Sequence, residues 1–213
     1  MSPVNLQCNY TTSQKYKTMR NLLKTGLVSV ALLATVVVNA SEKLNVKVAP
    51  ASKMLAIELT EVVDGETISI KDLDGEVLFF EKLSKSSEYS KVFSFSTLPQ
   101  GLYFVESKEA AKIQVTPVII NESGVAIVEN ASKTYTAPKV SLDGDILNVK
   151  VRNYGKAPVT ISIYNELGAL LTKTESNTNA LVFGSFRTAN VEAEKLTVSV
   201  TEGDYNFVEE VKL

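Results

Sequence analysis

The chain has 213 residues, of which 45% are hydrophobic and 22% are charged, and its formal net charge is −2. This composition is typical of a folded globular protein and argues against a disordered chain. The chain has no histidine and a single cysteine, Cys8, which excludes imidazole bases, His-ligated zinc and disulfides between residues of this chain.

The first 40 residues have the organisation of an export signal. They contain four basic residues and no acidic one, followed by an almost wholly apolar run at 25–38 and the small-residue ending "VNA" at 38–40. This order predicts a signal peptide over residues 1–40 that is cleaved after Ala40. An uncleaved anchor is the alternative, although the run is shorter than the roughly 20 residues that span a bilayer. Met19 is an alternative translation start, in which case residues 1–18 are not part of the protein.

Cleavage changes the charge balance of the chain. The remainder keeps 18 basic and all 24 acidic residues, a net charge of −6. Such an acidic chain argues against binding to nucleic acid, and we expect no membrane association after cleavage. Cys8 precedes the apolar run, so a lipid anchor of the lipoprotein type is not expected. We predict an exported protein of the periplasm, the cell surface or the extracellular space.

After residue 41 the apolar residues alternate with a period of two, and β-branched and aromatic residues carry the pattern. Strands are expected at 54–63, 67–73, 76–83, 91–96, 102–107 and 112–120. Asp64-Gly65 and Asp74-Gly75 are both expected to form hairpin turns. Short strands with turn signals every 8 to 12 residues are typical of a β-sandwich.

The pattern recurs in the second half of the chain. Five residues have partners at an offset of 93: Ile68 and Ile161, Ile70 and Ile163, Asp72 and Asn165, Gly75 and Gly168, Val77 and Leu170. Residues 195–200 correspond to 101–106 with a shift of about one further residue. This repeat predicts an all-β fold with two tandem immunoglobulin-like antiparallel sandwiches after the signal peptide helix. We place the domains at 41–133 and 134–213, with a hairpin expected within the joining segment 116–138.

Two turns hold the candidate motif residues. In "DLDG", we expect Asp72 to cap a tight turn and Gly75 to adopt a positive φ, with Asn165 and Gly168 in the same roles in the repeat. Calcium binding by the two aspartates is the alternative, but Leu167 replaces Asp74 in the repeat, so a metal site is not duplicated.

The second turn is "LPQGLY" at 98–103. Leu98, Pro99 and Gly101 are expected to form a corner before a strand that begins its alternation with Tyr103. In that strand, Tyr103 and Val105 face one way and Leu102 and Phe104 the other, so one of the two sets lies in the core.

These motifs resemble the C-terminal sorting domain of the Por (type IX) secretion system and related immunoglobulin-like domains of secreted bacterial proteins. The resemblance rests on Asp72, Gly75 and Val77, and on Leu98, Pro99, Gly101, Tyr103 and Val105. It covers about residues 55–115 and implies a sandwich that is recognised during secretion.

We predict a non-enzymatic protein without catalytic, metal or cofactor residues. The first functional hypothesis is a structural, adhesive or protein-binding module of the cell envelope, whose edge strands could accept a strand from a protein partner. The alternatives are an accessory or cargo-sorting module of type IX secretion, and a calcium-dependent glycan binder. The sequence makes no prediction of oligomeric state.

Overall fold

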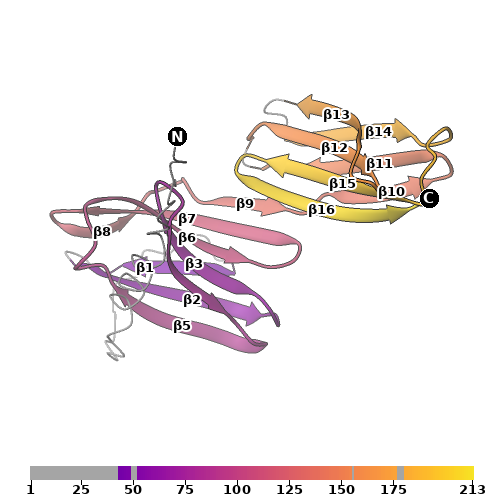
Figure 1. Cartoon of the computed structure of the whole chain (residues 1–213). Helices are drawn as coiled ribbons and strands as arrows, with labels where there is room; N and C mark the ends of the chain where they lie inside the picture. The colour runs from indigo at the N-terminus through magenta and orange to yellow at the C-terminus, as the bar shows by residue number, and fades with distance from the viewer. Residues whose placement is uncertain (1–42, 49–51, 155, 177–179) are drawn as a thin grey trace, which may run out of the picture. The chain divides into compact units, whose positions relative to one another are not determined.

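A computed structural model describes residues 43–48, 52–154, 156–176 and 180–213 (Figure 1). The predicted signal peptide and the alternative start at Met19 lie outside the described residues. Within the described part of the chain, no helix has the length and apolar character needed to cross a membrane.

The described residues form β-strands, as the alternation predicts. The first half contains β1 (Leu44–Val48), β2 (Met54–Val62), β3 (Thr67–Asp72), β4 (Val77–Lys82), β5 (Ser86–Ser94), β6 (Gly101–Lys108), β7 (Lys112–Asn121), β8 (Gly124–Ile127) and β9 (Lys133–Thr136). The second half contains β10 (Lys139–Asp143), β11 (Ile146–Arg152), β12 (Val159–Asn165), β13 (Leu170–Ser176), β14 (Leu181–Arg187), β15 (Lys195–Glu202) and β16 (Tyr205–Lys212).

The strands form two sandwiches with the same strand order. In the first module a sheet of order β1-β2-β5 faces a sheet of order β4-β3-β6-β7-β8, and Figure 1 shows the two layers. In the second module the sheets are β10-β11-β14 and β13-β12-β15-β16. Each strand from β10 to β16 therefore takes the place of its counterpart from β1 to β7. The predicted all-β fold of two antiparallel sandwiches is confirmed.

The chain contacts divide the molecule into two compact units. The first contains the described residues up to Ser107 together with Val115–Ser132, and the second contains Lys108–Gln114 and Lys133–Leu213. The first residues of β7 therefore belong to the second unit. This unit also contains β9, which pairs with β7.

Each module encloses its own core because one face of each sheet is apolar. In the first core Leu55 and Ile57 of β2 pack in one cluster with Ile68 and Ile70 of β3. In the second core Leu147 and Val149 of β11 share a cluster with Ile161. These side chains are at most 1% exposed. Burial of apolar surface on this scale is the main stabilising term of a sandwich that has no disulfide.

The turn at Asp64-Gly65 differs from the prediction. Gly65 has the expected positive φ of 80°, but β2 pairs with β1 and β5 whereas β3 belongs to the opposite sheet. The turn therefore carries the chain across the sandwich and does not form a hairpin. The physical reason is that both strands bury apolar faces, which face each other across the core only if the strands lie in different sheets.

The hairpin expected within residues 116–138 is present. β7 pairs antiparallel with β8, with Val118 opposite Ile127 and Asn121 opposite Gly124. Gly124 begins β8 with a φ of 133°, and a Cβ at this position would lie 2.4 Å from the carbonyl oxygen of Ser52. The next residue, Val125, donates its N–H to that same oxygen at 2.8 Å. Glycine is required here because the backbone of Ser52, just before β2, approaches closely.

We expect Gly124→Ala to lower the free energy of unfolding by about 3 kcal/mol or more, from backbone strain together with the clash with Ser52. Gly144→Ala is the matched control, because Gly144 also has a positive φ, 54°, but has open space around its Cβ position. The control should lose only about 1 kcal/mol. Urea denaturation of both variants measures the difference, and equal losses would contradict the close approach of β8 to Ser52.

Candidate functional site in the first module

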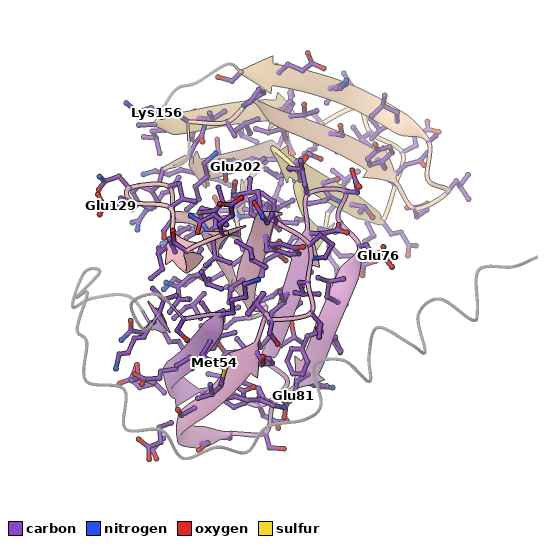
Figure 2. The ribbon with its side chains drawn as sticks, turned by 90° about the vertical axis from the view of Figure 1, so that its left-hand side faces the viewer. Met54, Glu76, Glu81, Glu129, Lys156 and Glu202 are labelled. Carbon is purple, nitrogen blue, oxygen red and sulfur yellow. The ribbon has the colours of Figure 1, made fainter. Side chains whose placement is uncertain are left out.

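The turn between β3 and β4 is held by one carboxylate. Oδ1 of Asp72 accepts the N–H of Asp74 at 3.0 Å and the N–H of Glu76 at 2.8 Å. The backbone closes the same turn, since Gly75 donates to the carbonyl of Asp72 at 3.2 Å and has a φ of 80°. Glu76 is labelled in Figure 2. Asp72 therefore acts as the predicted turn cap.

The turn between β12 and β13 repeats this arrangement. Oδ1 of Asn165 accepts the N–H of Leu167 at 3.1 Å and the N–H of Ala169 at 2.8 Å. Gly168 donates to the carbonyl of Asn165 at 3.0 Å and has a φ of 76°. An uncharged amide thus does in the second module what the carboxylate does in the first. The turn needs an acceptor oxygen at this position and does not need a negative charge.

The strands that flank the two turns share an irregularity as well. The register between β3 and β4 shifts between Ile70 and Lys71, and the register between β12 and β13 shifts between Ile163 and Tyr164. These positions are again 93 residues apart. A bulge twists a hairpin locally, so the two modules bend the same hairpin at the same place.

The corner before β6 is fixed by a tyrosine. The hydroxyl of Tyr103 donates to the carbonyl of Pro99 at 2.9 Å, and the ring is only 5% exposed. Leu98 is buried in the first core and its N–H donates to Phe95, whose ring packs edge-on against Tyr103 with centroids 6.1 Å apart. A tyrosine at the start of this strand that bonds back to the preceding loop is a recurrent device of immunoglobulin-like sandwiches. Gly101 has a φ of 157°, a backbone conformation that residues with a side chain rarely adopt.

The turn and the corner lie near one another in the structure. Burial of the Tyr103 ring raises the pKa of its hydroxyl, and the nearby carboxylate of Asp72 raises this pKa further. The two halves of the sequence motif, separated by about 30 residues, therefore meet at one end of the first sandwich. Tyr103 and Val105 belong to the core, while Leu102 and Phe104 are half-buried on the other face, as the alternation allowed.

The second module has no such corner. Its strand β15 buries Val198, Val200 and Glu202, which correspond by alternation to Tyr103, Val105 and Ser107 of β6. Ser107 bonds Glu66 in the first module, and Glu202 lies opposite Val159, 93 residues after Glu66, in the second. Ser107 and Glu202 therefore correspond, and the offset in this strand is 95, two residues more than in the turn. The predicted shift of one residue is wrong, because a shift by one would turn every core side chain of the strand to the opposite face.

A buried carboxylate of the first module was not found from the sequence. Glu66 is 0% exposed, and its carboxylate accepts from Nζ of Lys43 at 2.6 Å, from Oγ of Ser107 at 2.6 Å and from the N–H of Val63 at 3.1 Å. Its partners are up to 41 residues away in sequence, so no local pattern identifies them. The three bonds compensate the carboxylate for the water that it loses on burial.

In the second module the buried acid lies on a different strand. Val159, 93 residues after Glu66, lies opposite Glu202 in the β12–β15 register. Glu202, labelled in Figure 2, is 0% exposed, and neither carboxylate oxygen has a hydrogen-bond partner among the described residues. Burial raises the pKa of Glu202 to about 7. The cause is the loss of solvation of the charged form.

The acids of the turn have a structural explanation in hydrogen bonding. Asp72 is engaged with two backbone N–H groups, while Asp74 is exposed on the turn. Among the described residues, no group of three or more His, Cys, Asp or Glu side chains is arranged to hold a metal ion. The arrangement positions a turn and a corner, and with them the surface at this end of the module.

We expect Asp72→Asn to change the free energy of unfolding by less than about 0.5 kcal/mol, because an amide oxygen can accept both N–H groups. Asp72→Ala should lower it by about 1 to 2 kcal/mol, since two N–H groups lose their acceptor. Asn165→Asp and Asn165→Ala form the matched pair in the second module. Chemical denaturation measures all four, and a large loss in Asp72→Asn would show that the negative charge itself is needed.

The pKa of Glu202 predicts a pH dependence of stability. Its ordinary value of 4.5 is raised to about 7 by folding, so the stabilising contribution of the protonated group is complete below pH 4.5 and is lost as the pH rises through 7. We expect the unfolding free energy to fall between pH 5 and pH 8 by on the order of 2 kcal/mol from this group. Glu202→Gln should remove this part of the fall, as measured by urea denaturation at both pH values. An unchanged pH dependence in Glu202→Gln would contradict the assignment.

Comparison with protein families gives one match. Residues 49–121 match the family described as "Secretion system C-terminal sorting domain". The matched segment contains the Asp72 turn and the Tyr103 corner, and the family is the one that these motifs resembled. No curated protein matches the chain.

Several solved structures are similar to this chain at low sequence identity. A two-domain fibronectin type III segment from chicken tenascin is 9% identical, with a TM-score of 0.28, over 80% of this chain and 97% of that chain. Chicken CNTN1 FN1–FN3 domains are 11% identical, with a TM-score of 0.27, over 76% and 60%. The BSP domain of a biofilm associated protein is 12% identical, with a TM-score of 0.28, over 80% and 29%. The fold assignment rests on the strand order and the two cores described above.

The turn, the corner and the family comparison agree on the same part of the chain. Residues 49–121 of the first sandwich match the C-terminal sorting domain family of the Por secretion system.

Proposed function

We propose that this protein is an exported cargo of a type IX secretion system and that its first module takes part in sorting. The observation that carries the proposal is the family match over residues 49–121, which includes the Asp72 turn and the Tyr103 corner. The match favours sorting over the envelope structural or adhesive role that we expected first from the sandwich alone. Passage across the outer membrane to the cell surface or the medium follows from the same proposal.

The β3–β4 hairpin offers a surface for recognition. Leu73 at the turn is 68% exposed, and Val77 and Phe80 of β4 are 41% and 61% exposed. Exposed apolar side chains that gather on one element mark interaction sites more often than scattered ones do. We assign the contact with the secretion machinery to these three residues.

The proposal includes no enzymatic activity. The chain has no histidine, and its one cysteine lies in the predicted signal peptide. The buried Glu66 is engaged by Lys43 and Ser107, as expected for a structural acid. Protein partners are proposed to bind the exposed hairpin or an edge strand such as β16, whose Glu209, Glu210 and Lys212 also discourage unspecific pairing.

The full chain with a C-terminal epitope tests the proposal in a bacterium that has a type IX system. We expect the protein outside the outer membrane of the parent strain and in the periplasm of a strain lacking the outer-membrane translocon, as measured by protease accessibility and immunoblotting of the medium. The same location in both strains would show that the first module does not sort when the second module follows it.

The hairpin variants test the recognition surface. Leu73→Ser with Phe80→Ser should leave most of the protein in the periplasm of the parent strain, with an unchanged melting temperature because both side chains are exposed. Leu167→Ser with Leu170→Ser is the matched control on the equivalent hairpin of the second module, where these side chains are 87% and 53% exposed. Equal export of the two double variants would contradict the assignment of the contact to the first hairpin.

A further inference from the structure

The outer face of the β10-β11-β14 sheet gathers cations and large apolar side chains at one end. Lys139 of β10 lies opposite Lys150 of β11, which in turn lies opposite Phe183 of β14. One step along the sheet, Arg152 lies opposite Leu181. Neighbouring strands are about 4.8 Å apart and same-face residues about 6.8 Å apart, so these five side chains form one continuous patch. We call them the basic face.

The members of the basic face point away from the core. All five are exposed, with Leu181 at 51% and Phe183 at 62%, while their neighbours Val149, Val151 and Val182 are buried. Among the described residues, Lys139, Lys150 and Arg152 form no ion pair. Three positive charges thus stand together without local compensation in a chain whose net charge is negative.

The equivalent sheet of the first module lacks this feature. On the outer face of β1-β2-β5, Lys47 is paired with Glu58 at 2.6 Å, and Glu88 lies opposite Thr60. The charge of that face is therefore balanced or negative. The basic face is a property of the second module alone and does not follow from the shared fold.

Beside the basic face lies a row of uncharged polar side chains. Ser141, Asn148 and Ser185 lie opposite one another across the three strands. Oγ of Ser185 donates to Oδ1 of Asn148 at 2.8 Å. This bond uses only the oxygen of the Asn148 amide, so its N–H groups remain available as donors. Cations, an exposed aromatic ring and neutral hydrogen-bonding groups therefore lie close together on the outer face of these three neighbouring strands.

We propose that the basic face of the second module binds an acidic polysaccharide. The charge is complementary, since Lys139, Lys150 and Arg152 can each contact a carboxylate or sulfate of such a chain. The ring of Phe183 offers an apolar surface to a sugar, and the Ser141–Asn148–Ser185 row can bond sugar hydroxyl groups. A partner that repeats negative charge and hydroxyl groups along an extended chain matches all three parts of this face.

Other anionic partners match fewer of these features. A peptide that adds to a sheet binds along an edge strand, whereas these side chains project from the face of the sheet. An anionic bilayer would gain about 1 kcal/mol from each cation, which by itself does not anchor a protein stably. The hydroxyl-bonding row has no role in either case. The binding is independent of the sorting function proposed for the first module.

Binding of the purified full chain to polygalacturonate tests the proposal, with neutral dextran, poly-glutamate and vesicles containing anionic lipid as comparison probes. We expect binding to polygalacturonate, and we expect its affinity to fall as salt is raised from 0.05 to 0.5 M. Added salt shortens the Debye length and so screens the attraction between exposed charges. Lys139→Gln, Lys150→Gln and Arg152→Gln together should weaken it by on the order of tenfold. Phe183→Ser alone should weaken it as well, which a purely electrostatic attraction would not show.

A charge-matched control separates the basic face from overall charge. Lys82→Gln, Lys85→Gln and Lys108→Gln remove three exposed cations elsewhere and should leave the affinity unchanged. The proposal is overturned by an absence of binding to polygalacturonate, by an equal loss in the two triple variants, or by equally tight binding of poly-glutamate or the vesicles. Loss of binding in EDTA would likewise overturn it in favour of a metal-dependent site. Unchanged melting temperatures show that the variants remain folded.

Discussion

The closure of two apolar sheet faces over one core is the constraint on which each module depends. Ile57 of β2 and Ile70 of β3 are buried in the same core from opposite sheets, so the chain crosses the sandwich between them. That requirement decides the use of the Asp64-Gly65 turn and the strand order. The chain has no disulfide to replace this burial, so the stability of each module depends on these apolar faces.

The two modules share their strand order and hairpin turns but differ in the corner before the strand that follows. The capped turns at Asp72 and Asn165 are held by the same hydrogen bonds, and the bulges beside them coincide. The Tyr103 corner, by contrast, is absent from the second module, whose equivalent position is Val198. Recognition features therefore vary on a scaffold whose hairpin geometry is constant, which is consistent with different roles for the two modules.

The buried acids show how the same core accepts a charge in two ways. Glu66 is compensated by Lys43, Ser107 and a backbone N–H, whereas Glu202 has no partner among the described residues and has a raised pKa. Carboxylates that lose solvation either gain hydrogen bonds or become protonated near neutral pH. The first module compensates its acid with hydrogen bonds, and the acid of the second module has a raised pKa. The stability of the second module therefore depends on pH near neutrality.

The sequence by itself determined the all-β class, the repeat at an offset of 93 and the turn roles of Asp72, Gly75, Asn165 and Gly168. These depend on the period of two and on the local chemistry of Asp, Asn and Gly, which a short window contains. The tertiary structure alone decided the sheet to which each strand belongs, the offset of 95 in β15, the partners of Glu66 and the gathering of Lys139, Lys150 and Phe183. These depend on pairing between strands far apart in the chain, and alternation in one strand carries no information about its neighbour.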